Sequence, residues 1–195
     1  MSPEEIILEY YPSGSRACEI LMRHGEQVAD KSLEIAGRLS HLNPDLDFIR
    51  EAAMLHDIGI FMTKAPGIGC FGKHAYLCHG FLGRELLDTL GLPGHGLVAE
   101  RHTGAGITKA NILDQGLPLP CRDMVPETLE ETIICVADKF FSKSPEKDKG
   151  EKTRETVINE LARMDATHAQ RFSQWADQLI SSPSWPPPGN RCRHA

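Results

Sequence analysis

The sequence predicts an all-α fold in a single domain, and three observations lead to this prediction. Apolar residues recur at spacings of three or four along most of the 195 residues, which is the period of an amphipathic helix. Glycine and proline lie between these apolar stripes, where helices are expected to end. No segment shows the strict alternation of apolar and polar residues that is typical of a half-buried strand.

The first part of the chain contains two predicted helices and a loop. The first helix carries an apolar stripe that includes a histidine, and the stripe consists of Ile20, His24, Val28, Ser32, Ile35 and Leu39. The second helix begins after the turn signal at residues 43–45 and ends at Gly59, with His56 on its apolar face. Residues 59–72 are rich in glycine, so we expect a loop there.

Two shorter helices are expected next, and each carries a histidine. The first has a leucine stripe that shares its face with His79 and ends at Gly91. The second covers residues 93–103 and carries His102. Residues 104–126 contain several glycines and prolines, so we expect an irregular but ordered segment.

The last part of the chain contains three further predicted helices. One begins at Pro126 with an acidic first turn and carries Asp138 within its apolar stretch. Residues 142–152 are charged and are expected to form an exposed connection. Two amphipathic helices then close the domain over about residues 151–180, and the proline-rich tail 181–195 is expected to lack fixed structure.

These elements suit one domain over residues 1–180, with a core over about residues 15–145. The 21 Lys and Arg against 27 Asp and Glu give a formal charge of −6, which disfavours binding to duplex nucleic acid or to an anionic membrane surface. No apolar run is long enough to span a bilayer and residues 1–5 do not resemble a signal peptide, so we expect a cytoplasmic protein. The six cysteines form no Cys-x-x-Cys pair, and neither a disulfide scaffold nor a thiolate zinc site is expected.

Six polar residues are predicted to meet in the interior and to hold metal. They come from five helical segments and lie on or beside apolar stripes: His24, His56, Asp57, His79, His102 and Asp138. Burying two carboxylates with four imidazoles is costly without a cation, and a divalent metal supplies one. Nitrogen and oxygen donors without thiolate favour iron, manganese, zinc, cobalt or nickel over an all-oxygen magnesium or calcium site. Six candidates are too many for one catalytic ion, so two ions sharing a carboxylate are expected.

The order of these residues, with the motif His56-Asp57-Ile58-Gly59, resembles the HD superfamily of metal-dependent phosphohydrolases, specifically its HDIG-type members. The resemblance covers about residues 15–145 and implies a compact HD-domain helical bundle. It implies that one ion is held by His24, His56, Asp57 and Asp138, with Asp57 as the bridge. It also implies a second ion at His79 and His102. Iron or manganese is the favoured metal, and zinc, cobalt, nickel or magnesium remains open.

The sequence departs from many HDIG members at one position, because Ile60 stands where they have a lysine. A cation that binds the substrate phosphate must therefore come from elsewhere, and the candidates are Arg101, Lys64 and Lys73. Arg101 is favoured since it neighbours His102, and we assign it a catalytic role beside Asp57. His74 either completes the shell of the second ion or lines the mouth of the site. The other histidines are interpreted as ordinary residues of turns or the tail: His41, His95, His168 and His194.

The function expected from this resemblance is hydrolysis of a nucleotide or a related small phosphate ester by a metal-activated water. Two divalent ions and two carboxylates leave a net positive site, which suits an anionic substrate. Two alternatives remain open. One is a di-iron oxygenase with a similar ligand order, and the other is a regulatory module that binds metal and nucleotide without turnover.

Overall fold

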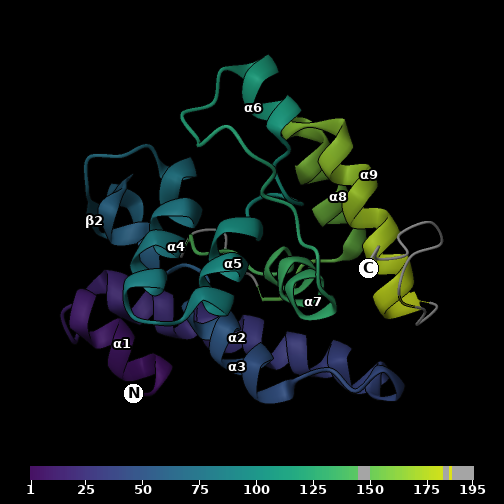
Figure 1. The fold of residues 1–195 in the computed structure, drawn as a ribbon, viewed down its shortest axis with the longest axis horizontal. Helices are drawn as coiled ribbons and strands as arrows, with labels where there is room; N and C mark the ends of the chain where they lie inside the picture. Colours follow the sequence, from purple (N-terminus) through teal and green to yellow (C-terminus); the bar gives the residue numbers. More distant parts are fainter. Residues whose placement is uncertain (145–149, 182–184, 186–195) are drawn as a thin grey trace.

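A computed structural model describes residues 1–144, 150–181 and 185, and it confirms the all-α prediction (Figure 1). The α-helices of these residues are α1 (Pro3–Tyr10), α2 (Arg16–Arg38), α3 (Leu46–Leu55), α4 (His79–Thr89), α5 (Pro93–Arg101), α6 (Lys109–Gln115), α7 (Leu129–Asp138), α8 (Arg154–Met164) and α9 (Ala166–Ala176). A π-helical turn, Asp177–Ser181, extends α9. The predicted tail lies almost wholly outside the described residues.

Side-chain caps explain where several helices begin. Ser15 accepts a hydrogen bond from the Cys18 amide at the start of α2, and Asp45 does the same for the Phe48 amide at the start of α3. Thr128 caps α7, which therefore begins at Leu129 and not at the predicted Pro126.

Two apolar clusters form the main core, and the helices that carry the polar residues lie between them. The larger cluster joins α2, α3 and α7 to the closing helices α8 and α9. The second joins α1 to parts of α2, α3 and α4. Helix α5 contributes Val98 to the first and Ala99 to the second. The last turn of α5, which precedes His102, is therefore packed against both apolar clusters.

Residues 59–72 contain more regular structure than a loop. A 3-10 turn, Ile58–Met62, follows α3 directly, and the two-residue strands β1 (Lys64–Ala65) and β2 (Cys70–Phe71) pair antiparallel. Helix α3 ends at Leu55, so His56 caps the helix and does not lie on its face. The prediction that this helix continues to Gly59 was wrong, because the chain tightens into the 3-10 turn.

Two helices were not predicted. Helix α1 precedes the first predicted helix and is capped by Ser2, whose hydroxyl accepts from the Glu5 amide. Helix α6 lies within residues 104–126, which were expected to be irregular. A capping box between Thr108 and Asn111 starts it, and the short helix packs Ile112 into a small third cluster with Ile107 and Met124.

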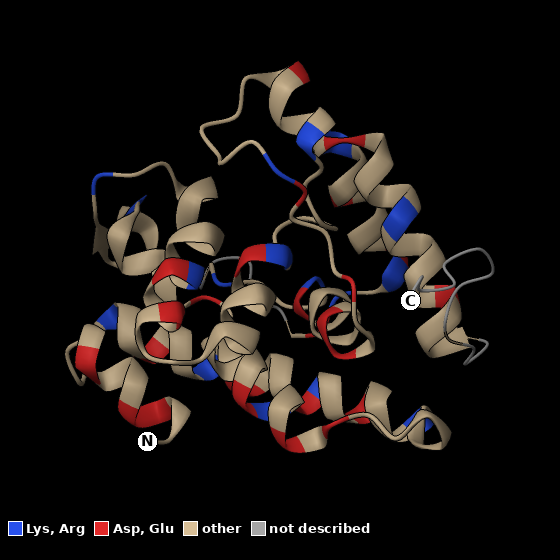
Figure 2. Ribbon diagram, in the orientation of Figure 1, with Lys and Arg blue, Asp and Glu red and all other residues tan. Residues whose placement is uncertain are grey.

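Within the described residues, no helix is long and apolar enough to cross a membrane. Lysine and arginine are dispersed among acidic residues over the ribbon in the view of Figure 2.

Candidate metal centre

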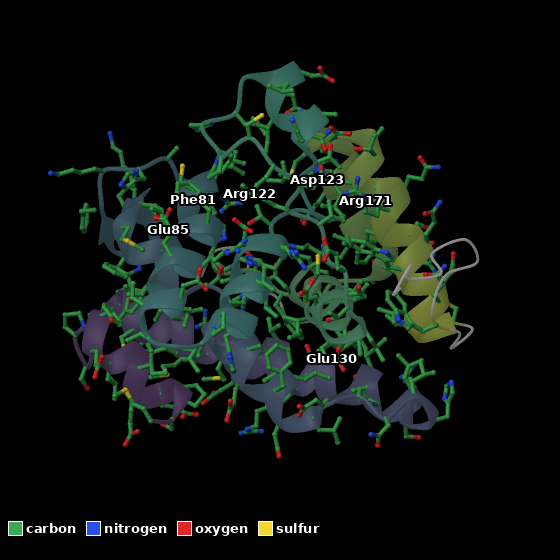
Figure 3. The ribbon with its side chains drawn as sticks, viewed as in Figure 1. Phe81, Glu85, Arg122, Asp123, Glu130 and Arg171 are labelled. Atoms are coloured by element: carbon green, nitrogen blue, oxygen red, sulfur yellow. The ribbon has the colours of Figure 1, made fainter. Side chains whose placement is uncertain are left out.

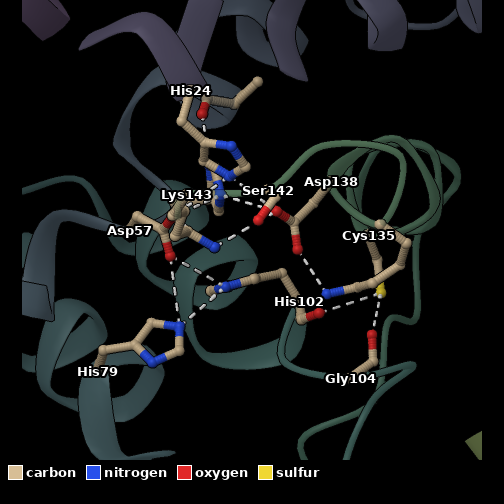
Figure 4. A network of polar contacts seen from close by, with 12 residues as sticks. His24, Asp57, His79, His102, Gly104, Cys135, Asp138, Ser142 and Lys143 are labelled. Carbon is tan, nitrogen blue, oxygen red and sulfur yellow. Dashed lines mark hydrogen bonds and ion pairs between the residues drawn. The ribbon is translucent and has the colours of Figure 1, made fainter. Parts of the chain in front are cut away.

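The six polar residues predicted to meet do lie together, at the junction of α2, α3, α4, α5 and α7. Each is nearly inaccessible to solvent, with at most 4% of its surface exposed: His24, His56, Asp57, His79, His102 and Asp138. They are drawn together from positions up to 114 residues apart in the chain. Figure 4 shows most of them around the Asp57 carboxylate.

Asp57 is the centre of this arrangement, because its two oxygens face different histidines. Asp57 Oδ2 lies 3.1 Å from His56 Nε2 and 3.5 Å from His24 Nε2. Asp138 Oδ1 completes this half of the cluster, at 2.9 Å from His24 Nε2 and 3.5 Å from His56 Nε2.

The other Asp57 oxygen faces the second half of the cluster. Asp57 Oδ1 lies 3.3 Å from both His79 Nε2 and His102 Nε2, and those two ring nitrogens are 3.1 Å apart. One carboxylate is thus shared between two groups of donors, as expected of a residue that bridges two ions.

Three of the histidines are oriented by the ends of helices. His56 and His102 cap the C-termini of α3 and α5, and His79 is the first residue of α4. In each ring Nδ1 lies 2.6–2.8 Å from the carbonyl oxygen three residues earlier. Each carbonyl oxygen accepts an Nδ1–H bond from its histidine, and the Nε2 atom of each ring is thereby directed into the cluster.

His24 is held differently, since it lies in the middle of α2. Its Nε2 contacts Asp138, while its Nδ1 is buried and has no hydrogen-bond partner. The predicted stripe of α2 placed this ring correctly. The other five residues lie at or beside helix ends, where the spacing of apolar residues predicts the placement of a side chain less well.

Two glycines allow the helices to approach closely enough for the histidines to meet. A Cβ atom on Gly59 would lie 2.2 Å from the carbonyl oxygen of His79 and 2.5 Å from the Gly83 amide nitrogen. A Cβ atom on Gly80 would lie 2.7 Å from the carbonyl oxygen of Ala99. Gly59 therefore belongs to the motif because of packing, and both glycines position the second half of the cluster.

The nitrogen and oxygen atoms that face one another in the cluster are better arranged to bind a divalent metal than to hydrogen-bond to each other. Among the described residues, Asp57 Oδ1 and His56 Nε2 are fully buried and have no hydrogen bond of acceptable geometry, while Asp57 Oδ2 forms an ion pair with Lys143 Nζ at 2.9 Å. Leaving such atoms unpaired costs about 1–3 kcal/mol each. Two triads have ligand atoms within 4.8 Å of one another, namely His24, His56, Asp138 and His56, Asp57, His102. Imidazole and carboxylate donors suit iron, manganese or zinc.

The charges of the cluster show how it is balanced without an ion. Burial opposes ionisation of Asp57, but the His56 and Lys143 charges outweigh it and hold the pKa of this carboxyl well below its usual range. Burial likewise disfavours the charged form of His56, yet the neighbouring carboxylates raise its pKa to about 9. Burial lowers the pKa of His24 to about 4 and that of His102 to about 3. These two rings are neutral at pH 7 and ready to donate a lone pair.

Two lysines near the cluster were missed by the sequence analysis. Lys143 Nζ lies 2.9 Å from Asp57 Oδ2 and 3.5 Å from Asp138 Oδ1, and Lys139 pairs with Asp138 Oδ2. Lys143 belongs to the segment predicted as an exposed connection, but only 16% of its side chain is exposed. Its position five residues after Asp138 was the available signal, although spacing alone does not show where a chain turns after a helix.

The cluster opens into a cavity of about 580 Å³. Its lining includes His79, His102, Asp138 and Tyr76, with apolar residues from β1 to α4 on one side and from α8 on the other. Three lysines, Lys139, Lys143 and Lys152, also line it. This cavity is large enough for a small ligand.

The cations proposed from sequence lie elsewhere. Arg101 donates from one Nη to both carboxylate oxygens of buried Glu131, at 3.0 and 2.9 Å, and does not line the cavity. Lys64, Lys73 and His74 are exposed and are also absent from the lining. The structure thus brings together all six predicted ligands and none of the predicted phosphate-binding residues.

Comparison with known proteins agrees with this arrangement. The uncharacterized protein MJ0778 of Methanocaldococcus jannaschii is 36% identical over 126 residues, which cover 63% of this chain and 67% of that protein. The tRNA (cytidine(56)-2'-O)-methyltransferases of Picrophilus torridus and Thermoplasma volcanium are 36% and 33% identical over 65% of this chain. The matched part is 33% of each methyltransferase, so the chain spans about a third of their length.

Solved structures show the same fold. The HD domain of the L. monocytogenes phosphodiesterase PgpH, alone and in complex with cyclic-di-AMP, matches with a TM-score of 0.54 and 16% sequence identity. The matches cover 92% and 93% of this chain and 95% of that domain. A family model described as HD domain matches residues 21–142, a range that contains all six clustered side chains. The chain therefore belongs to the HD-domain family.

Proposed function

We propose that this protein is a metal-dependent phosphohydrolase that acts on a nucleotide or another small phosphate ester. The observation that carries the proposal is the Asp57 carboxylate, whose two buried oxygens face two different groups of imidazole nitrogens. The fold is shared with a domain that binds cyclic-di-AMP, which supports a nucleotide as ligand.

In this proposal the chain holds two ions with its six clustered residues. His24, His56, Asp138 and Asp57 Oδ2 surround the first position, and His79, His102 and Asp57 Oδ1 surround the second. Divalent ions, when bound, polarise a phosphoryl oxygen and lower the pKa of a water molecule. The protein contributes the orientation of the donors, through the Nδ1 contacts to backbone carbonyls, and a cavity beside them that can receive the substrate.

The lysines of the cavity would bind the substrate phosphate. Lys143 contacts both carboxylates of the cluster, so its ammonium group lies where a phosphate above the metal ligands would arrive. Lys152 lines the same cavity and pairs with Glu160 at 2.7 Å. These residues supply the positive charge that Arg101 was expected to supply.

The test of this function joins metal analysis to a substrate screen. Protein purified without added metal is analysed for its elements and reloaded with manganese or ferrous iron. It is then assayed for formation of phosphate or of a nucleoside phosphate from mono-, di-, cyclic and dinucleotides. We expect up to two ions per chain and hydrolysis without dioxygen. Oxygen consumption coupled to product formation would instead support the di-iron oxygenase. Silence on every substrate with both ions bound would support the regulatory module.

The role of Lys143 is tested by comparison with a lysine that the sequence analysis favoured. Lys143→Met is expected to reduce kcat/KM by about a hundredfold, because a charged hydrogen bond to phosphate is worth about 1.5–3 kcal/mol. Lys64→Met is the matched control, since this exposed lysine does not line the cavity. Equal loss in the two variants, with unchanged metal content, would contradict the assignment.

The methyltransferase relatives do not favour a second function. Their names refer to tRNA, but the chain corresponds to only a third of their length.

A further inference from the structure

A second pocket, of about 180 Å³, lies beside the main cavity. The two share a wall, because both are lined by Leu77, Thr103, Gly104 and Met164. Thr103 and Gly104 of this wall directly follow His102 in the chain, and two extended residues span at most about 7 Å. The side pocket is therefore a short step from the metal-ligand cluster.

The walls of the side pocket are largely apolar. Leu77, Ile107, Leu117 and Met164 line it, and the first three also belong to or pack against the small cluster around α6. The volume is well below the roughly 300–1,000 Å³ of pockets for drug-sized ligands. It suits one planar ring system.

Three polar atoms of residues that line the side pocket have no hydrogen-bond partner within the described part of the chain. They are Thr103 Oγ1 and both ring nitrogens of His168, a residue of α9 with 7% of its surface exposed. A buried polar group without a hydrogen bond costs about 1–3 kcal/mol. A ligand with its own donors and acceptors would remove that cost.

The side pocket is held in shape by contacts that do not use these free atoms. Arg171 of α9 donates hydrogen bonds of 2.6 Å to the carbonyl oxygens of Ala105 and Gly106, and Figure 3 shows it beside this segment. On the opposite side the amides of Asn111 and Gln115 donate to Asp165. These contacts use neither Thr103 Oγ1 nor the ring nitrogens of His168.

The form of His168 suits recognition of a heterocycle. Burial lowers the pKa of this histidine, so the ring is neutral at pH 7. A neutral imidazole offers one N–H donor and one nitrogen acceptor, and the Thr103 hydroxyl can act as either. Nucleobases carry donors and acceptors along their edges and apolar faces above and below the ring.

We propose that the side pocket binds the heterocyclic base of a nucleotide whose phosphate lies at the metal-ligand cluster. The proposal rests on the phosphohydrolase function for the position of the phosphate, but the pocket itself is defined by groups outside the cluster. It assigns Thr103 and His168 as residues that determine base specificity.

Binding is tested first with nucleosides, which carry no phosphate and cannot be hydrolysed by this enzyme. Adenosine, guanosine, cytidine and uridine are each titrated into the purified full-length protein while the ring resonances of His168 are followed by NMR. We expect at least one nucleoside to shift these resonances and Thr103→Val to weaken its binding about tenfold, the loss of about one hydrogen bond. Absence of any shift with all four would overturn the proposal.

The second test measures specificity. For the metal-loaded enzyme, kcat/KM is compared between the nucleoside 5'-monophosphate of the best binder and ribose 5-phosphate, which lacks the base. His168→Leu is expected to reduce this ratio about tenfold without lowering the melting temperature, because no hydrogen bond within the protein is lost. Gln170→Ala, an exposed change on the same helix, is the control.

The outcomes separate the two proposals. An unchanged ratio in both Thr103→Val and His168→Leu would contradict base binding in this pocket. Nucleoside binding without turnover of any phosphate ester would contradict the phosphohydrolase function and still support the pocket.

Discussion

Asp57 and Glu100 are both carboxylates with 2% of their surface exposed, yet their surroundings differ. Glu100 Oε2 accepts from Arg84 and Glu100 Oε1 accepts from Arg122, whose Nε donates at 3.0 Å; Arg122 is labelled in Figure 3. Asp57 faces four imidazole nitrogens at 3.1–3.5 Å, and its one lysine partner, Lys143, lies 2.9 Å from Oδ2.

The difference shows how a structural ion pair is distinguished from a metal site. Guanidinium groups have only donors, so two arginines satisfy a carboxylate completely. The imidazoles around Asp57 turn their Nε2 atoms toward one another and toward a shared carboxylate, an arrangement that suits a bound divalent cation. Burial alone is therefore no sign of function, whereas the type of the neighbouring atoms is.

The largest effect is expected from Asp57→Ala. This change removes the residue shared by both halves of the cluster, so we expect turnover to fall by about a thousandfold or more and metal content to fall further than in His79→Ala. Elemental analysis and phosphate release measure the two effects, with Asp114→Ala as an exposed control. Equal metal loss in folded Asp57→Ala and His79→Ala proteins would contradict the bridging position.

Glu100→Gln is expected to act on stability and not on metal. The neutral amide cannot balance Arg84 and Arg122, so the free energy of unfolding should fall by about 2 kcal/mol. Denaturant unfolding measures this loss, and Glu85→Gln, on the exposed side of α4, should leave it unchanged. Metal loss comparable to that of Asp57→Ala would show that the two carboxylates are not separate centres.

The metal-ligand cluster should also respond to pH, through His56. The pKa of His56 is raised to about 9, so its charged form stabilises the metal-free fold below pH 6.5 and this contribution is lost as pH rises through 9. Metal must displace that proton, and the apparent affinity should therefore increase about tenfold per pH unit from 7 to 9. Competition with a chromophoric chelator measures the slope. A flat profile would show that His56 is already neutral in the free protein.

The smallest effect is expected from Arg101→Lys. One Nη of the guanidinium contacts Glu131 and the other lies 3.2 Å from Glu127 Oε1. The single nitrogen of lysine cannot keep both ion pairs, so stability should fall by about 1 kcal/mol. Because Arg101 lies outside the cavity, kcat/KM for phosphate release should change by less than about threefold. A loss as large as that of Lys143→Met would restore Arg101 to the catalytic role predicted from sequence.

The sequence by itself determined the helical class and the six residues that meet. Helical periodicity reports the buried face of a helix such as α2, and His24 lay on that face. The order of the motif residues then identified the family. These conclusions depend on local sequence pattern and on residue chemistry, and both can be read from one amino-acid sequence.

Only the tertiary structure decided what surrounds the cluster. Lys143 turns inward after α7, Arg101 meets Glu131 thirty residues away, and His168 lines a pocket built partly by the unpredicted α6. Periodicity does not encode how the chain leaves a helix end or which distant side chain a cation finds. Those choices follow from packing between elements far apart in the sequence, so residues that recognise substrate are seen only when the helices are assembled.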